Sequence, residues 1–242
     1  MRINIAVPHY NQSGFLSEAL DSIIQGNGAD DHQIDLTVID DGSDSREVEE
    51  AMRITLGKRE DLPPNTTLHW LAQTPNQGSA VAINEGHRSM GESDWMTWCS
   101  SDNVYCDGWL GDLLALADEK AGAVYGDFIW TKPGARTFMV GRDYDPEYLI
   151  NHPHNCYIGP AFIIRSHVWE SAGPHVGWNA HDYGHWLRVE EACWEESLRI
   201  RRVAKPLCTY LAHSERATER RKGSKWQDAE RHQQEAIKRR NK

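Results

Sequence analysis

The chain has 242 residues, of which 39% are hydrophobic and 26% charged, and its formal net charge is -10. These values are typical of a globular protein, and the acidic balance argues against general nucleic-acid affinity, because phosphate contacts need Lys and Arg. No apolar run reaches the roughly 18 residues of a membrane-spanning helix, and Arg2 leads directly into a strand instead of a signal peptide, so we expect a cytoplasmic protein. The five cysteines lack the spacing of a zinc site or a disulfide scaffold and are expected to be reduced thiols.

The N-terminal part of the chain alternates strand and helix patterns. Apolar, β-prone runs predict strands at 3–7, 36–39, 68–71 and 95–99, and apolar residues at helical spacing predict helices at 15–24, 44–52 and 80–87. Gly26 to Gly28 ends the first helix, and Asp44 with Glu47 can cap the second. This order predicts an α/β fold with a mostly parallel sheet covered by helices on both faces.

Beyond residue 103 the pattern is looser. The expected elements are helices at 110–117, 167–171 and 181–193, a further helix that starts at 145–147, strands at 123–130, 161–164, 200–203 and 207–211, and a polar loop at 131–142. We expect one domain over residues 1–214, followed by a basic segment at 215–242 with ten Lys and Arg against five Asp and Glu. A solvated helix is the simpler interpretation of this tail, and contact with an acidic partner is the alternative.

Three of the predicted strands run directly into polar residues. The first ends in Pro8-His9-Tyr10-Asn11, the second in Asp40-Asp41-Gly42-Ser43, and the fourth in Ser100-Ser101-Asp102-Asn103. In an open α/β sheet, ligands bind outside the carboxyl ends of the strands. The three segments therefore predict one shared site for a charged, hydrogen-bonding ligand.

With these residues in view, the chain resembles the family 2 glycosyltransferases, which have the GT-A fold, over roughly residues 3–215. The matching motifs, in chain order, are Val7 to Asn11, Val38 to Ser43, Asn76-Gln77-Gly78 with Asn84, Ser101-Asp102-Asn103, Gly159 to Phe162, His181-Asp182-Tyr183 with Trp186, and His213. The resemblance implies a Rossmann-like single domain with a nucleotide-sugar-binding half at 1–103 and an acceptor-binding half at 104–214, which contains a small acceptor-side subregion. It also implies transfer of a sugar from a nucleotide diphosphate donor to an acceptor hydroxyl, with inversion at the anomeric carbon.

The same resemblance implies a set of donor-binding residues. They are Pro8, His9, Tyr10, Asn11, Asp41, Asn76, Gly78, Ser101 and Asp102. Asp41 would lie against the base, and because a carboxylate only accepts hydrogen bonds it suits uracil, thymine or guanine and disfavours cytosine or adenine. A UDP-sugar is therefore the favoured donor. The structural alternative is that these residues simply form turns.

A divalent metal ion, Mg²⁺ or Mn²⁺, is the implied cofactor. Asp102 aligns with the last acid of the family's Asp-x-Asp metal motif, whereas Ser100 stands where the first acid would be. One carboxylate can still suffice, since Mg²⁺ is commonly bound by only one or two carboxylates together with phosphate oxygens and water. His213 matches the family's histidine after the last strand, which approaches the metal or the diphosphate. A turn-capping role is the alternative for Asp102.

On the acceptor side, the resemblance implies that Asp182 is the catalytic base, although His181 replaces the acid that usually precedes it. Capping of a helix is the structural alternative for Asp182. The candidate acceptor-binding residues are Trp109, Gly159, Trp178, His181 and Trp186. The expected acceptor is a saccharide, a glycolipid or another hydroxyl-bearing molecule.

Two other functions remain open at this point. A non-catalytic module that binds nucleotide sugars or glycans is favoured by Ser100 in place of an acid. A nucleotidyltransferase would share the sheet and the metal acid, but it would need a Gly-rich loop with Lys or Arg after the first strand, and residues 8–14 have neither feature.

Overall fold

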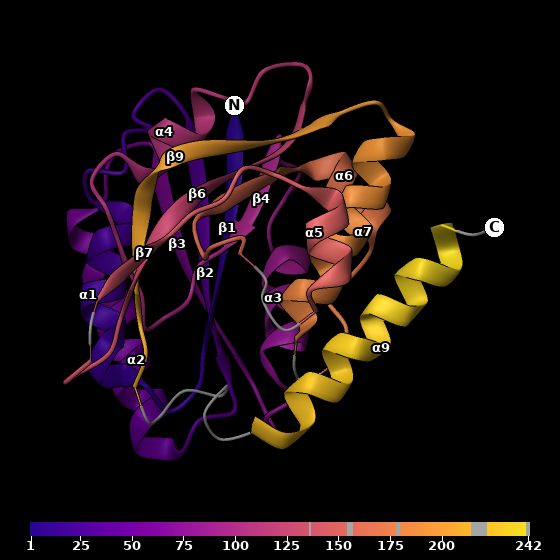
Figure 1. Cartoon of the computed structure of the whole chain (residues 1–242). Coiled ribbons are helices and arrows are strands. Elements are labelled where there is room, and N and C mark those ends of the chain that lie inside the picture. The colour runs from indigo at the N-terminus through magenta and orange to yellow at the C-terminus, as the bar shows by residue number, and fades with distance from the viewer. Residues whose placement is uncertain (136, 154–156, 178–179, 214–221, 241–242) are drawn as a thin grey trace.

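The computed structural model describes residues 1–135, 137–153, 157–177, 180–213 and 222–240, and the side chains of the last segment from Gln227 onward. Among these residues a single sheet of nine strands has the order β3-β2-β1-β4-β8-β6-β9-β5, with β7 paired to β6 (Figure 1). The strands are β1 Arg2–His9, β2 Gln33–Asp41, β3 Thr66–Gln73, β4 Trp95–Trp98, β5 Val104–Tyr105, β6 Ala121–Thr131, β7 Phe138–Val140, β8 Phe162–Arg165 and β9 Arg199–Leu211. The helices are α1 Ser13–Ile24, α2 Ser45–Gly57, the 3-10 turn η1 Lys58–Asp61, α3 Ser79–Ser89, α4 Trp109–Leu114, α5 Pro146–Asn151, α6 Ser166–Ala172, α7 His181–Glu195 and α9 Lys222–Arg240.

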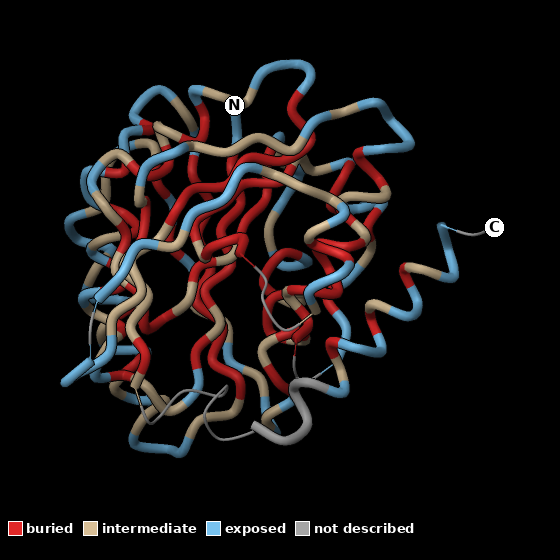
Figure 2. The backbone as a smooth tube through the Cα atoms, in the orientation of Figure 1, coloured by how far each residue is buried: buried red, intermediate tan, exposed pale blue. Residues whose placement is uncertain are grey.

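The first four strands are parallel, as the alternation of patterns predicted. In β1, Ile3 and Ile5 belong to the core cluster that contains Leu16 and Leu20 of α1, whereas Ala6 belongs to a second cluster with Ile83 of α3. Successive side chains of a strand point to opposite faces, so each strand supplies both cores. Helices α1 and α2 therefore cover one face, and α3, α6 and α7 cover the other (Figures 1 and 2). The predicted α/β fold with helices on both faces is confirmed.

The second half of the sheet is mixed instead of parallel. Strand β8 pairs antiparallel with both β4 and β6, and β6 then pairs parallel with β9. The two short strands predicted at 200–203 and 207–211 are one strand, β9, whose register shifts beside Asp127, opposite Pro206. Proline has no N–H for the ladder, which explains why the apolar pattern breaks there without ending the strand.

The segment predicted as a polar loop at 131–142 instead contains strand β7, which forms a hairpin with β6. Its strand is only three residues long, too short for a periodic signal, so the turn residues dominated the pattern. The hairpin projects from the body at the lower left of Figure 1.

The basic tail is a helix, α9, and it packs on α5 and α7 instead of standing apart. Ala229 and Ala236 are buried against the cluster that contains residues of α7, and the His232 ring lies over Gly184, where a Cβ atom would come within 2.7 Å of it. Gln233 donates a hydrogen bond to the Ile150 carbonyl at 2.8 Å. The tail therefore completes the core on this face.

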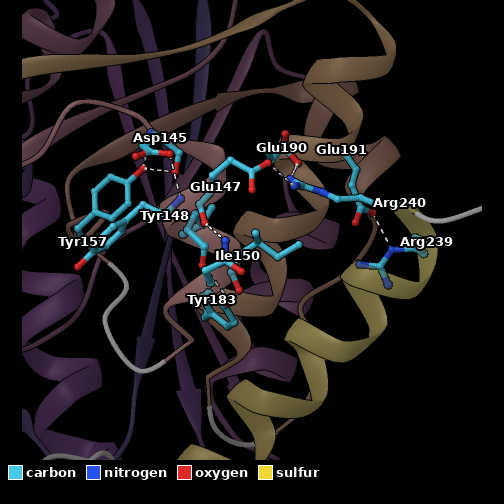
Figure 3. Close-up of polar contacts among 12 residues, drawn as sticks. Asp145, Glu147, Tyr148, Ile150, Tyr157, Tyr183, Glu190, Glu191, Arg239 and Arg240 are labelled. Carbon is cyan, nitrogen blue, oxygen red and sulfur yellow. Dashed lines mark hydrogen bonds and ion pairs between the residues drawn. The ribbon is translucent and has the colours of Figure 1, made fainter.

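Two arginines near the end of the tail pair with acids of α7. Arg239 pairs with Glu191 at 2.7 Å, and Arg240 pairs with Glu190 (Figure 3). These ion pairs lie within the chain, and contact of the tail with a separate acidic partner stays a prediction. In the part of the chain that the structure describes, no helix is long and apolar enough to cross a membrane.

Candidate active site

The polar segments at the ends of β1 and β2 lie side by side and are joined by hydrogen bonds. The register pairs His9 with Asp40. Asn11, in a left-handed conformation at φ +50°, donates its backbone N–H to the Ser43 hydroxyl at 2.9 Å and accepts from the Asp44 N–H through its side chain at 2.9 Å. Asparagine tolerates this conformation better than most residues, which explains its place in the turn. The expected meeting of these two segments at one edge is observed.

His9 is buried under this edge. Only 1% of it is exposed, and burial lowers the pKa of the imidazole, a shift that nearby Asp40 opposes only in part. His9 is therefore neutral at pH 7 and adds no cation for a diphosphate. Tyr10, by contrast, is 37% exposed and offers a ring at the surface of the same loop.

Asp41 has a role that differs from the expected contact with a base. Its carboxylate accepts four hydrogen bonds from the last residue of β3 and the segment that follows it, at 2.5 to 3.0 Å. The donors are the side chains of Gln73 and Asn76 and the backbone N–H groups of Gln77 and Gly78. Four bonds use about all the acceptor capacity of a carboxylate, and Asp41 is only 2% exposed. The structure thus corrects the sequence-based assignment: Asp41 holds a loop and has no acceptor site left for a base.

The loop that Asp41 holds approaches the end of β2 closely. A Cβ atom on Gly42, which has φ +72°, would lie 2.6 Å from the Asn76 nitrogen. Gly78 also has a positive φ, +94°, and starts helix α3. Both glycines are therefore required by the backbone, and the predicted donor residues Asn76 and Gly78 shape the loop next to the end of β2.

Asp102 and His213 meet, although 111 residues separate them. The His213 Nε2 lies 3.0 Å from the Asp102 Oδ2, and the Ser100 hydroxyl donates to the Asp102 Oδ1. The His213 ring stacks on Phe15 of α1, with 4.5 Å between ring centroids. The two residues predicted as metal ligands are therefore adjacent, and Ser100 has become a hydrogen-bond donor to the acid that remains.

This pair of donors fits a hard divalent cation that shares its coordination with a ligand. A carboxylate oxygen and an imidazole nitrogen converge at a largely buried position, where Asp102 is 6% exposed. Within the described residues no group of three His, Cys, Asp or Glu side chains could hold a metal by itself. Any cation here would need further oxygen ligands, such as those of a diphosphate.

The start of helix α7 is tied to the donor side of the sheet. His181 Nε2 lies 2.9 Å from the hydroxyl of Ser79, which directly follows Gly78. The His181 ring also lies 5.8 Å from that of Trp98, the last residue of β4. Asp182 is the next residue and lies half-buried in the first turn of α7.

A second histidine completes this connection. His175 Nδ1 lies 3.0 Å from His181 Nδ1, and the Asn84 side chain clamps the His175 backbone through two hydrogen bonds of 2.8 and 2.9 Å. Burial and the neighbouring His185 hold the pKa of His175 well below its usual value, so the ring is neutral at pH 7. Helix α3 thus fixes both the acceptor-side loop and the start of α7. Sequence reasoning missed Ser79 and His175, because no local pattern marks contacts between residues so far apart.

Three predicted acceptor-binding residues are core residues instead. Trp109 is fully buried, and its indole N–H lies 3.4 Å from the Ile23 carbonyl. Trp186 is 3% exposed and packs against Phe162. A Cβ atom on Gly159 would lie 2.5 Å from the Phe128 ring, so this glycine is needed for packing. None of the three offers a surface to an acceptor. Trp178 lies outside the described residues.

Comparisons with known proteins agree with this arrangement. A sequence model described as Glycosyl transferase family 2 matches residues 4–169. An uncharacterized glycosyltransferase of Mycoplasma genitalium, MG060, is 25% identical over 105 residues, which cover 43% of this chain and 33% of that protein. The chain thus spans about a third of this relative.

Solved structures share the fold. The TarS 1-349 fragment of S. aureus in complex with UDP has a TM-score of 0.69 at 17% identity, over 98% of this chain and 65% of that one. The mannosyltransferase PcManGT of Pyrobaculum calidifontis, in complex with GDP-Man and Mn²⁺, has a TM-score of 0.63 at 18% identity, over 98% and 64% of the two chains. At such identities the likeness shows a GT-A fold, and the family match covers most of the chain. The chain belongs to glycosyl transferase family 2.

Proposed function

We propose that this protein transfers a sugar from a nucleoside diphosphate sugar to an acceptor hydroxyl, with a divalent cation bound at Asp102 and His213. The single observation that carries the proposal is the contact between these two residues at the carboxyl edge of the sheet. This contact lies next to the hydrogen-bonded ends of β1 and β2. In an open α/β sheet, the diphosphate of a bound nucleotide lies at that position. The neighbours with UDP, and with GDP-Man and Mn²⁺, support both the donor class and the cation.

UDP is the favoured nucleotide, on different grounds from those the sequence suggested. Asp41 is occupied by protein donors, so it does not support a choice of base. TarS was solved with UDP and with UDP-GlcNAc, and it is the solved structure with the higher TM-score of the two compared above. The proposal of UDP rests on that likeness.

Asp182 is proposed as the base of an inverting transfer. The acceptor oxygen attacks the anomeric carbon as the bond from that carbon to the diphosphate oxygen breaks, and the Asp182 carboxylate takes the acceptor's proton. The departing diphosphate keeps the electron pair of the broken bond. Asp102 and His213 would hold a divalent cation, and such a cation would supply positive charge against that of the diphosphate. Asp182 is suited to this role because the preceding residue, His181, contacts the Ser79 hydroxyl. This contact fixes the first turn of α7, which carries Asp182.

The proposal is tested by calorimetric titration of UDP with and without Mn²⁺. We expect Mn²⁺ to tighten UDP binding to the parent protein at least about tenfold, which is about 1.4 kcal/mol, and Asp102→Ala to remove this gain. Asp112→Ala is the matched control, since Asp112 pairs with Lys205 on the surface. Equal tightening by Mn²⁺ in Asp102→Ala and in the control would refute the cation site.

A further inference from the structure

The hairpin of β6 and β7 is built to stand away from the core. Its turn, Lys132 to Ala135, is closed by a 3.0 Å hydrogen bond from the Ala135 N–H to the Lys132 carbonyl, with Gly134 at φ +74°. Pro133 and Gly134 are the residues that a type II turn requires at its centre. Trp130 and Phe138 are cross-strand partners, and their rings stack at 5.0 Å. This aromatic pair stabilises the hairpin, whose β6 arm is also paired with β9.

Both faces of the hairpin are open. No described residue from Phe128 to Tyr148 is buried. Phe138 is 49% exposed and its neighbour Met139 is 61% exposed. Because adjacent strand residues point to opposite faces, neither face of β7 covers a core. Figure 2 shows this projecting segment largely as exposed. Phe138 and Met139 thus place one large, exposed apolar side chain on each face of the hairpin.

The charge of this segment is opposite to that of the molecule. Between Asp127 and Asp143 the sequence contains Lys132, Arg136 and Arg142 and no acid, in a chain whose net charge is -10. Arg142 is partly neutralised, since it pairs with Asp145 at 3.2 Å. The side chain of Lys132 is at the exposed turn. The hairpin thus combines aromatic and aliphatic side chains with local positive charge.

The hairpin also borders the candidate site. The Ala212 N–H donates to the Thr131 carbonyl at 2.8 Å, and the next residue, His213, contacts Asp102. Thr131 is the last residue of β6 before the turn. A surface that receives the hairpin would therefore lie next to the proposed cation site.

We propose that the hairpin docks on an anionic membrane surface. Aromatic side chains favour the membrane interface, and basic residues are attracted to anionic headgroups. A second copy of the chain is a weaker fit, because β7 is only three residues long and offers few hydrogen bonds to a second edge strand. The docking stands on the hairpin alone and does not depend on the proposed function.

Flotation with vesicles tests the docking. Vesicles of phosphatidylcholine with about 30 mol% phosphatidylglycerol carry the anionic headgroups, and pure phosphatidylcholine is the neutral comparison. We expect binding to the anionic vesicles only, a decrease as ionic strength rises, and at least about a tenfold loss of partitioning in the double variant Phe138→Ser, Met139→Ser. Lys132→Glu should weaken binding as well.

The double variant Met52→Ser, Leu56→Ser is the matched control, since Met52 and Leu56 are 38% and 39% exposed on α2. It should bind anionic vesicles as the parent does. Equal loss in both double variants, or equal binding of the parent to neutral and anionic vesicles, would overturn the proposal. So would a dimer, detected by sedimentation velocity without vesicle binding, that Phe138→Ser, Met139→Ser dissociates. Because no donor is present, these outcomes do not depend on catalysis, and UDP affinity measured on the same variants reports separately on the proposed function.

Discussion

Asp41 shows how much of a residue's role is decided by its neighbours. A carboxylate after a strand, in this motif, is compatible with reading a base and equally with holding a loop. The structure distinguishes the two roles, because Gln73, Asn76, Gln77 and Gly78 already supply four donors. Such a set of partners, 32 to 37 residues away, leaves no local pattern in the sequence.

This role of Asp41 predicts the behaviour of Asp41→Asn. The amide of Asn would present donors where two of the four present donors point, so we expect the free energy of unfolding to fall by about 2 kcal/mol, as measured by urea denaturation. The preference for UDP over CDP, measured by competition, should change less than about threefold, which is under 1 kcal/mol. Asp44→Asn is the control, because Asn caps a helix as well as Asp does at that position. An Asp41→Asn protein with unchanged stability and no preference for UDP would show instead that Asp41 contacts the nucleobase.

Other single residues show the same limit of sequence reasoning. Asp102 and His213 were expected at one site because each follows a strand, and the structure brings the two side chains into contact, while their role as metal ligands stays a prediction. Trp109 and Trp186 were assigned to the acceptor because they neighbour polar residues in the chain, yet a helix buries one face regardless of its neighbours in sequence. Burial of a particular ring depends on packing between elements that lie far apart in the chain.

At the scale of elements, the alternation of strands and helices was strong enough to predict the four parallel strands and the helices between them. The antiparallel insertion of β8 was not predictable, since its four buried residues have no signal for direction. Helix α9 was predicted as a helix, but its packing depends on Ala229, Ala236 and His232, which are too few to form an apolar stripe. The contact between α9 and α7 also depends on Gly184, which leaves space for the His232 ring because it has no side chain.

The packing of α9 predicts that the tail cannot be removed without cost. A chain that ends at residue 221 would expose the buried surface beneath Ala229 and Ala236 and lose the Gln233 bond to Ile150, so we expect a melting temperature lower by about 5 °C or more. The double variant Arg239→Gln, Arg240→Gln should lower the free energy of unfolding by less than about 1 kcal/mol, because these ion pairs are partly exposed and screened. An unchanged melting temperature after truncation would mean that α9 does not pack in solution as described.

At the scale of the whole molecule, the fold and the family follow from the order of motifs along the chain. The residues proposed for the donor follow strands, which explains why the sequence brings them to one edge of the sheet. The residues proposed for the acceptor lie in loops and at contacts such as Ser79 with His181, and these are specified by tertiary packing alone. For this reason the sequence identifies the reaction class more readily than the acceptor.

The most direct measurement of the central claim is release of nucleoside diphosphate from a panel of UDP- and GDP-sugars, with Mn²⁺ and with water as the acceptor, by the parent and by Asp182→Asn. The cap of α7 is Ala180, and Asp182 lies inside the first turn instead of capping the helix, so Asn, which is close to Asp in size, removes the proton acceptor without removing a cap. We expect turnover of at least one donor by the parent, and a rate at least about a hundredfold lower in Asp182→Asn, with UDP affinity and melting temperature unchanged. Failure of the parent to turn over any donor, or parental turnover by a folded Asp182→Asn protein, would contradict the account.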